Sequence, residues 1–78
     1  MPMVTLRLNG LLARDNANTY QVAIEGKRAR LKTVLSKMAV NLPEKAVAFY
    51  AINGKKVMID SWVDDGDIID VFPAVTGG

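Results

Sequence analysis

A single apolar stripe of helical period lies near the middle of the sequence. Between Arg28 and Leu42 the large apolar side chains recur three or four residues apart, and this spacing predicts an α-helix with one buried side. The stripe consists of Leu31, Val34, Leu35, Met38 and Leu42. Pro43 disfavours the α conformation at the residue before it and ends the predicted helix. A lone helix of this kind can bury its stripe only against a sheet.

Strand-like segments lie on both sides of the predicted helix. The first two alternate apolar and polar residues, and the later ones are rich in β-branched and aromatic residues. The segments are residues 4–9, 20–25, 47–52, 55–58 and 68–72. Asn53-Gly54 predicts a tight hairpin because both residues tolerate a positive φ, and Pro73 ends the last strand because it lacks a ladder donor.

This order of elements predicts an α+β fold of the β-grasp (ubiquitin-like) type. We expect a mixed sheet of four to five strands with one helix packed across one face. The last strand would lie parallel to the first, and the helix would supply the long crossover that parallel neighbours need.

The length and the residue types limit the chemistry. The 78 residues suffice for one domain, which we expect to comprise residues 1–73, followed by a tail of residues 74–78. The sequence has no Cys and no His, which excludes disulfides, thiolate or imidazole metal sites, Cys nucleophiles and His-based triads. No apolar run approaches the roughly 20 residues that cross a bilayer, so we expect a cytoplasmic protein without a membrane partner.

Charge is distributed unevenly along the chain. All ten Lys and Arg lie within residues 1–58, whereas residues 59–78 carry five Asp and no basic residue. We predict that Asp64, Asp65 and Asp67 lie beside the tail and dock on a basic partner surface, although a solvated turn has the same composition. The basic residues gather around the predicted helix, where a nucleic-acid patch is disfavoured because no aromatic residues are interleaved for stacking.

The aromatic residues fall in or near the later strands. Phe49, Tyr50 and Phe72 could leave an apolar surface for a partner, since a sheet covered by one helix has a second face. Trp62 precedes the acidic turn, and we expect it to pack at the edge of the core.

The tail extends beyond the predicted sheet. Its five residues, fully extended, reach about 16–18 Å from the domain, which is far enough to enter a site on another protein. Gly77 and Gly78 lack Cβ atoms, so this backbone can pass through a narrow channel. The reactive group at the tip is the α-carboxylate of Gly78, which is ionised at neutral pH.

The end of the sequence resembles a known family. Asp65-Gly66-Asp67, a strand, Phe72-Pro73-Ala74-Val75 and the final Gly77-Gly78 are together similar to the MoaD/ThiS sulfur carriers, which are relatives of ubiquitin. Within that family, Phe72-Pro73 before the diglycine is most similar to the small subunit of molybdopterin synthase.

The resemblance implies a carrier that is not itself an enzyme and binds no cofactor. An E1-like adenylating enzyme, using ATP and Mg²⁺ in its own site, would join the Gly78 carboxylate to AMP. A sulfur donor protein would then convert the adenylate into a thiocarboxylate. Val75, Thr76 and Gly77 would thread into the partner and Phe72 would dock against it. The recipient would be the large subunit of molybdopterin synthase.

Three alternatives share these features. The chain could be a ubiquitin-like modifier joined to lysines of other proteins through Gly78, or a thiamine-type sulfur carrier. From a different class, it could be an RNA-binding β-grasp module whose tail is inert.

Overall fold

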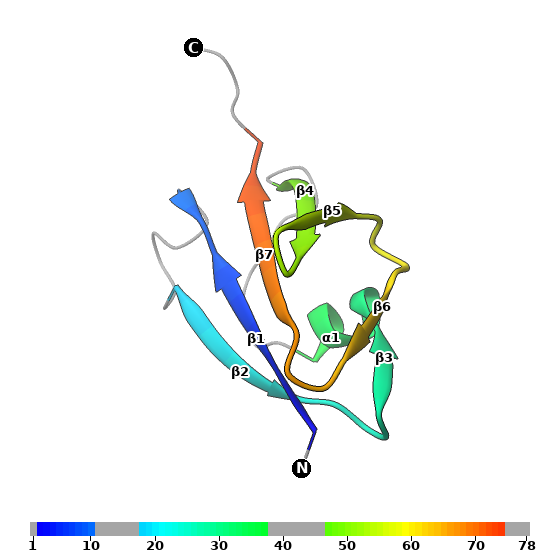
Figure 1. Cartoon of the computed structure of the whole chain (residues 1–78). Helices are drawn as coiled ribbons and strands as arrows, with labels where there is room; N and C mark the ends of the chain where they lie inside the picture. Colours follow the sequence, from blue (N-terminus) through cyan, green and yellow to red (C-terminus); the bar gives the residue numbers. More distant parts are fainter. Residues whose placement is uncertain (1, 11–17, 38–46, 75–78) are drawn as a thin grey trace.

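The structure is a computed structural model and describes residues 2–10, 18–37 and 47–74. Its elements in chain order are β1 (Met3–Leu8), β2 (Thr19–Ala23), β3 (Arg28–Arg30), α1 (Leu31–Ser36), β4 (Val47–Ile52), β5 (Lys55–Val57), β6 (Trp62–Asp64) and β7 (Ile68–Pro73). Figure 1 shows how these elements are arranged around α1.

A mixed five-stranded sheet forms the centre of the molecule, in the order β2-β1-β7-β4-β5. β7 lies parallel to β1, whereas the pairs β1–β2, β4–β7 and β4–β5 are antiparallel. β3 and β6 form a separate two-stranded sheet. The β-grasp prediction is confirmed, including the parallel pairing of the first and last strands.

The core lies between the five-stranded sheet and α1. Alternate residues of β1 and β7 point to the same face, because side chains along a strand alternate between its two sides. On the inner face they pack in one apolar cluster with residues of α1 and β6. The fully buried side chains are Leu6, Leu31, Ile69, Val4, Val34, Val63 and Val71. Burying each of them stabilises the fold by about 1.5–3 kcal/mol relative to exposure.

The helix begins later than the sequence pattern predicts. Arg28–Arg30 is a strand that pairs with Trp62–Asp64, so the prediction that the helix starts at Arg28 is wrong. A cation in the first turn of a helix interacts unfavourably with the helix dipole. Because Arg28 and Arg30 belong to a strand, they do not lie in the first turn of α1. α1 ends at Ser36; the predicted stripe residues Met38 and Leu42 lie outside the described residues.

Backbone carbonyls take the place of a side-chain cap on α1. The N-cap residue Arg30 makes no side-chain cap bond among the described residues. Instead the amide of Leu31 donates to the carbonyl of Ser61 at 2.8 Å, and that of Lys32 donates to the carbonyl of Ile59 at 2.9 Å. The segment leading into β6 therefore satisfies amides that would otherwise lack partners at the helix start.

Both predicted turns are confirmed, and one side chain joins them. Asn53 and Gly54 have φ of 52° and 84°, and Gly66 in the acidic turn has φ of 87°. The Asn53 side-chain amide donates to Asp67 Oδ1 at 2.9 Å, and its oxygen accepts from the amide of Ile68 at 2.9 Å. The hairpin thereby fixes the start of β7.

The only helix among the described ranges, α1, is too short to cross a membrane.

Candidate functional site

β7 positions the predicted reactive end of the chain. This strand lies between β1 and β4 and ends at Pro73, so Ala74 is the last residue described before the predicted site. Val75, Thr76, Gly77 and Gly78 lie outside the described residues, and their predicted roles remain predictions. The described part of the site is therefore the face and the end of the sheet from which the tail continues.

An aromatic pair lies on the outer face of the sheet near the end of β7. Phe49 and Phe72 are register partners, and their rings stack with centroids 4.5 Å apart and planes 17° from parallel. Lys56 Nζ lies 5.4 Å from the Phe49 ring centroid, within the range of a cation–π contact. This pair confirms an apolar surface on the second face of the sheet.

Tyr50 does not belong to that outer surface. It is a register partner of Val71, whose side chain is fully buried, and it packs against the core cluster. Of the three aromatic residues that could form an outer surface, Phe49 and Phe72 lie on the outer face and Tyr50 on the inner one, because neighbouring residues of a strand point to opposite faces.

An ion pair lies beside the aromatic pair on the outer face. Arg7 Nε and Nη2 donate to the two carboxylate oxygens of Asp70 at 2.8 and 2.7 Å, and Asn9 Nδ2 lies 3.4 Å from Asp70 Oδ1. Asp70 is only 6% exposed. The bond from Arg7 lowers the pKa of the Asp70 carboxyl, outweighing burial, which would raise it, and Asp70 in turn raises the pKa of Arg7.

Sequence reasoning did not single out this ion pair. The pairing of β1 with β7 brings Arg7 opposite Asp70. Arg7 falls on the polar side of the alternating segment 4–9, and Asp70 is the one polar residue of segment 68–72; these two signals together with the predicted parallel pairing could have identified them. The result is a bidentate guanidinium–carboxylate contact on the outer face, which holds the two central strands in register.

The acidic turn lies at the opposite end of β7 from the tail. It precedes Ile68, whereas the tail follows Pro73, and Figure 1 shows the strand running the whole height of the sheet between them. The expectation that Asp64, Asp65 and Asp67 lie beside the tail is wrong for its first residue, Ala74, because a turn before a strand and the residue after it lie at opposite ends of that strand.

The carboxylates of this turn all accept bonds from within the protein. Asp64 Oδ1 pairs with Arg28 Nε at 3.0 Å, and Asp65 Oδ1 accepts from the amide of Met3 at 2.9 Å. Asp67 accepts from the Asn53 side chain and, at 2.8 Å, from the amide of Asp64. These bonds join the start of β7 to β1, β3 and the hairpin; the docking role of the three residues remains a prediction.

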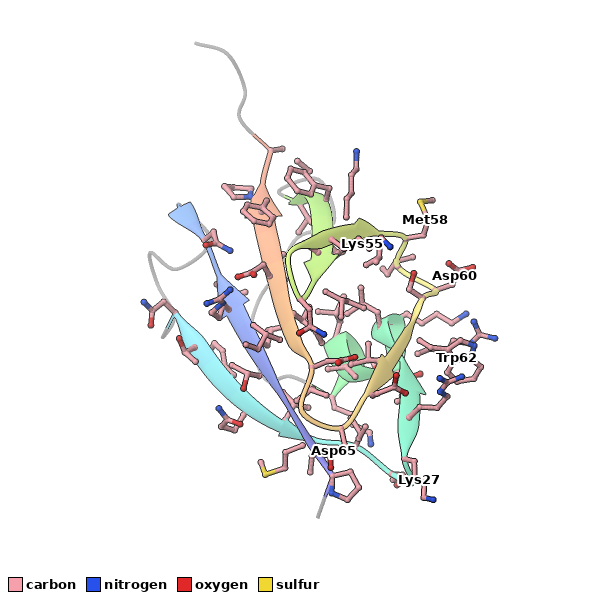
Figure 2. All side chains as sticks on the ribbon, in the orientation of Figure 1. Lys27, Lys55, Met58, Asp60, Trp62 and Asp65 are labelled. Carbon is pink, nitrogen blue, oxygen red and sulfur yellow. The ribbon has the colours of Figure 1, made fainter. Side chains whose placement is uncertain are left out.

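Trp62 projects to solvent rather than into the edge of the core. It is 46% exposed, and Figure 2 shows it on the outer side of β6. The guanidinium carbons of Arg30 and Arg28 lie 3.8 and 5.2 Å from the centroid of its ring system. The expectation that Trp62 packs at the edge of the core is wrong. In β6, which pairs with β3, the neighbouring residue Val63 faces the core and is fully buried. An aromatic residue thus does lie among the basic side chains.

The described residues offer no metal site: among them no three His, Cys, Asp or Glu side chains gather closely enough to hold an ion. The outer face of the sheet carries the Phe49–Phe72 stack and the Arg7–Asp70 pair; docking of a partner on Phe72 remains a prediction. A shallow groove adjoins the stack at the β4–β5 edge, where Lys56, Met58 and Ile59 line it.

Comparison with known proteins identifies the family. Curated proteins and solved structures yield no significant match to the chain. The model of the ThiS family matches residues 6–78, so the similarity covers the second half of β1, every later element and the final Gly77-Gly78. ThiS-family proteins are ubiquitin-like sulfur carriers, generally without enzymatic activity of their own, that interact with E1-like adenylating enzymes. This chain belongs to the ThiS family.

Proposed function

We propose that this protein carries sulfur as a thiocarboxylate on Gly78. The observation that supports this most is that the family match extends through Gly77-Gly78, five residues beyond the end of β7. The described domain supplies a rigid body with an outer face for docking, and the tail is long enough to reach an active site about 16–18 Å away.

The chemistry requires activation because a carboxylate resists attack by a nucleophile. The Gly78 carboxylate attacks the α-phosphorus of ATP in the partner's site, pyrophosphate leaves, and an acyl-adenylate forms; the partner's Mg²⁺ would stabilise the charge of the leaving group. The terminal sulfur of a donor persulfide attacks the acyl carbon and AMP leaves. A thiol then reduces the remaining S–S bond, which leaves the thiocarboxylate.

The recipient that we propose is the molybdopterin precursor bound to the large subunit of molybdopterin synthase. The support is the Phe72-Pro73 lead-in to the diglycine, with the Phe72 ring stacked on Phe49 at the outer face. A thiamine-type recipient and conjugation to lysines are the alternatives, and both use the same activated carboxylate.

Intact-mass analysis of the protein isolated from its own cells tests this proposal. The expected species carries one sulfur in place of one oxygen at the C-terminus, and the same spectrum reports whether Gly78 is the final residue. Incubation of that species with the large subunit and the sulfur-free pterin precursor should yield molybdopterin. Transfer only into the thiazole precursor would assign the thiamine branch, and an isopeptide-linked adduct would assign protein modification. Absence of any ATP-dependent change at Gly78 contradicts the proposal.

We propose that the acidic turn forms a separate contact with a basic surface of the adenylating enzyme. Because it lies at the far end of β7, a partner that holds the tail must span the length of this strand to reach it. Asp64→Asn and Asp65→Asn remove charge but keep a side-chain oxygen as acceptor. If the turn docks on a basic surface, the double variant should bind the adenylating enzyme more weakly at low salt and nearly as well as the wild type at high salt. Equal binding at low salt refutes the contact.

RNA binding is a second candidate because Trp62 lies exposed beside Arg28 and Arg30. Base stacking on an exposed aromatic residue with basic neighbours is a common mode of single-strand binding. The carboxylate of Asp64, paired with Arg28, disfavours a polyanion at the same place. Quenching of Trp62 fluorescence by single-stranded RNA, together with retention on heparin that is lost in Trp62→Ala, would support it, whereas unchanged fluorescence would exclude it.

A further inference from the structure

The chain segment that follows β1 passes close to the end of β7. The backbone amide and the side-chain amide of Asn9 both donate to the carbonyl of Val71, each at 3.1 Å. Gly10 then takes a φ of +58°, which L-residues with a side chain rarely adopt. The segment is thus fastened to β7 two residues before Pro73.

Gly10 lies directly against the proline ring. A Cβ atom placed on Gly10 would lie 3.0 Å from Pro73 Cγ and 3.7 Å from Pro73 Cδ. The shorter distance is a few tenths of an ångström below ordinary van der Waals contact, so either the pyrrolidine ring changes its pucker at Cγ or the two backbones move apart. Any side chain at position 10 would therefore displace Pro73, or Gly10 itself would have to move.

The opposite side of the same strand end is held by β4. Val47 pairs with Pro73, and the Phe49 ring stacks on Phe72, with a register irregularity between Val47 and Phe49. Residues Phe72–Ala74 are here named the tail base. Within it, Pro73 has Gly10 on one side and Val47 on the other, so the backbone direction is set at Pro73.

We propose that Gly10 is a positioning residue for the tail base, one that fixes the direction in which Gly78 is presented to the adenylating enzyme. The inference rests on the proposed function. Gly10 touches no reacting atom and acts through Pro73. A rotation at Pro73 changes the direction in which the chain leaves β7 toward its last five residues, and misplacement of a reacting group by about 1 Å can lower a rate about a hundredfold.

Gly26 serves as a control that separates the effect of the contact with Pro73 from the effect of backbone strain. Gly26 has φ of +68° with no atom within 4 Å of an added Cβ, so Gly26→Ala reproduces the strain of Gly10→Ala without the contact. Pro73→Ala removes the ring atoms that an added Cβ would meet. The double variant Gly10→Ala/Pro73→Ala completes a cycle that isolates the contact between the two positions.

Two measurements apply to each variant. Amide chemical shifts and residual dipolar couplings of Phe72 and Ala74 report the direction of the tail base without any partner. Adenylation kinetics with the cognate E1-like enzyme report delivery of the carboxylate. We expect Gly10→Ala to change the couplings and to lower kcat about tenfold, with KM within about twofold because the docking face is intact. Gly26→Ala should change neither, and Gly10→Ala should have no further effect once Pro73 is Ala.

The outcomes distinguish this inference from the proposed function. Unchanged couplings in Gly10→Ala, or changed couplings with a normal kcat, overturn the positioning role. If the wild type is never adenylated while the couplings change as expected, the proposed function fails and the contact of Gly10 with the tail base is supported. Should Gly10→Ala not fold, Pro73→Ala removes the same contact from the other side, and normal couplings and kcat in that variant overturn the inference.

Discussion

At the scale of single residues, Asp70 is the side chain whose ionisation bears most on stability. It is buried, and the hydrogen bonds from Arg7 lower the pKa of its carboxyl in the folded protein. A carboxyl whose folded pKa is lowered contributes stability above its unfolded pKa, about 3.9, and this contribution is lost as the pH falls through the folded pKa. We therefore expect Asp70→Asn to destabilise the protein at pH 7 and the difference from the wild type to shrink below about pH 4. Urea unfolding across this range measures it.

Arg7→Gln provides the control for this residue. Without the guanidinium, burial remains and the pKa of Asp70 should move upward, because burial penalises the charged carboxylate. The pH at which Asp70→Asn ceases to matter should therefore be higher in the Arg7→Gln protein than in the wild type. The same pH dependence in both backgrounds would show that Arg7 does not control this carboxyl.

At the scale of elements, β6 has two faces that should differ in their effect on stability. Val63 is fully buried against the core, whereas Trp62 is exposed beneath the arginines of β3. Val63→Ala removes buried methyl groups and leaves a cavity, so the free energy of unfolding should fall by about 2–3 kcal/mol. Trp62→Ala loses an exposed cation–π contact and should cost less than about 1 kcal/mol. Equal costs in denaturant unfolding would contradict this assignment of faces.

The elements also show which parts of the fold a sequence can predict. Alternation over six residues is sufficient to predict β1, and Asn53-Gly54 is sufficient to predict the hairpin, because each signal lies within the element itself. The three-residue strands β3 and β6 are too short to have a period. The sequence predicts helix for Arg28–Arg30 because these residues directly precede the apolar stripe. Their conformation is instead determined by pairing with Trp62–Asp64, which lies far along the chain. The exposure of Trp62 follows from that pairing, so it could not be predicted without it.

At the scale of the whole molecule, the proposed function divides the work between the described domain, which would dock, and Gly78, which would react. The resemblance to the family and the predicted chemistry of Gly78 could be obtained from the sequence, because the motif that carries them lies near the end of the chain. The outer face proposed for docking could not, because it combines β1, β4 and β7, and the place of the acidic turn required the direction of β7. The contact between Gly10 and Pro73 joins segments more than 60 residues apart and has no local signature.

This separation predicts that the tip can be altered without affecting the fold. Deletion of Gly77 and Gly78 should leave the urea midpoint and the melting temperature nearly unchanged, since the core and the hydrogen bonds of β7 lie upstream. It should abolish ATP-dependent pyrophosphate release by the adenylating enzyme. Gly78→Ala keeps the carboxylate but adds a Cβ, so it should lower the rate without abolishing it if the backbone passes a narrow channel.

An extension by one alanine beyond Gly78 is the matched control for chain length. It keeps both glycines and the whole docking face but moves the carboxylate about 3.5 Å further along the chain. If the partner activates a carboxylate at a fixed depth, the extended protein should fold normally, compete with the wild type for the adenylating enzyme and yield no adenylate. Adenylation of the extended or the shortened chain at the wild-type rate would mean that the reactive group lies elsewhere in the molecule. Loss of stability in either variant would mean that the tip belongs to the folded domain.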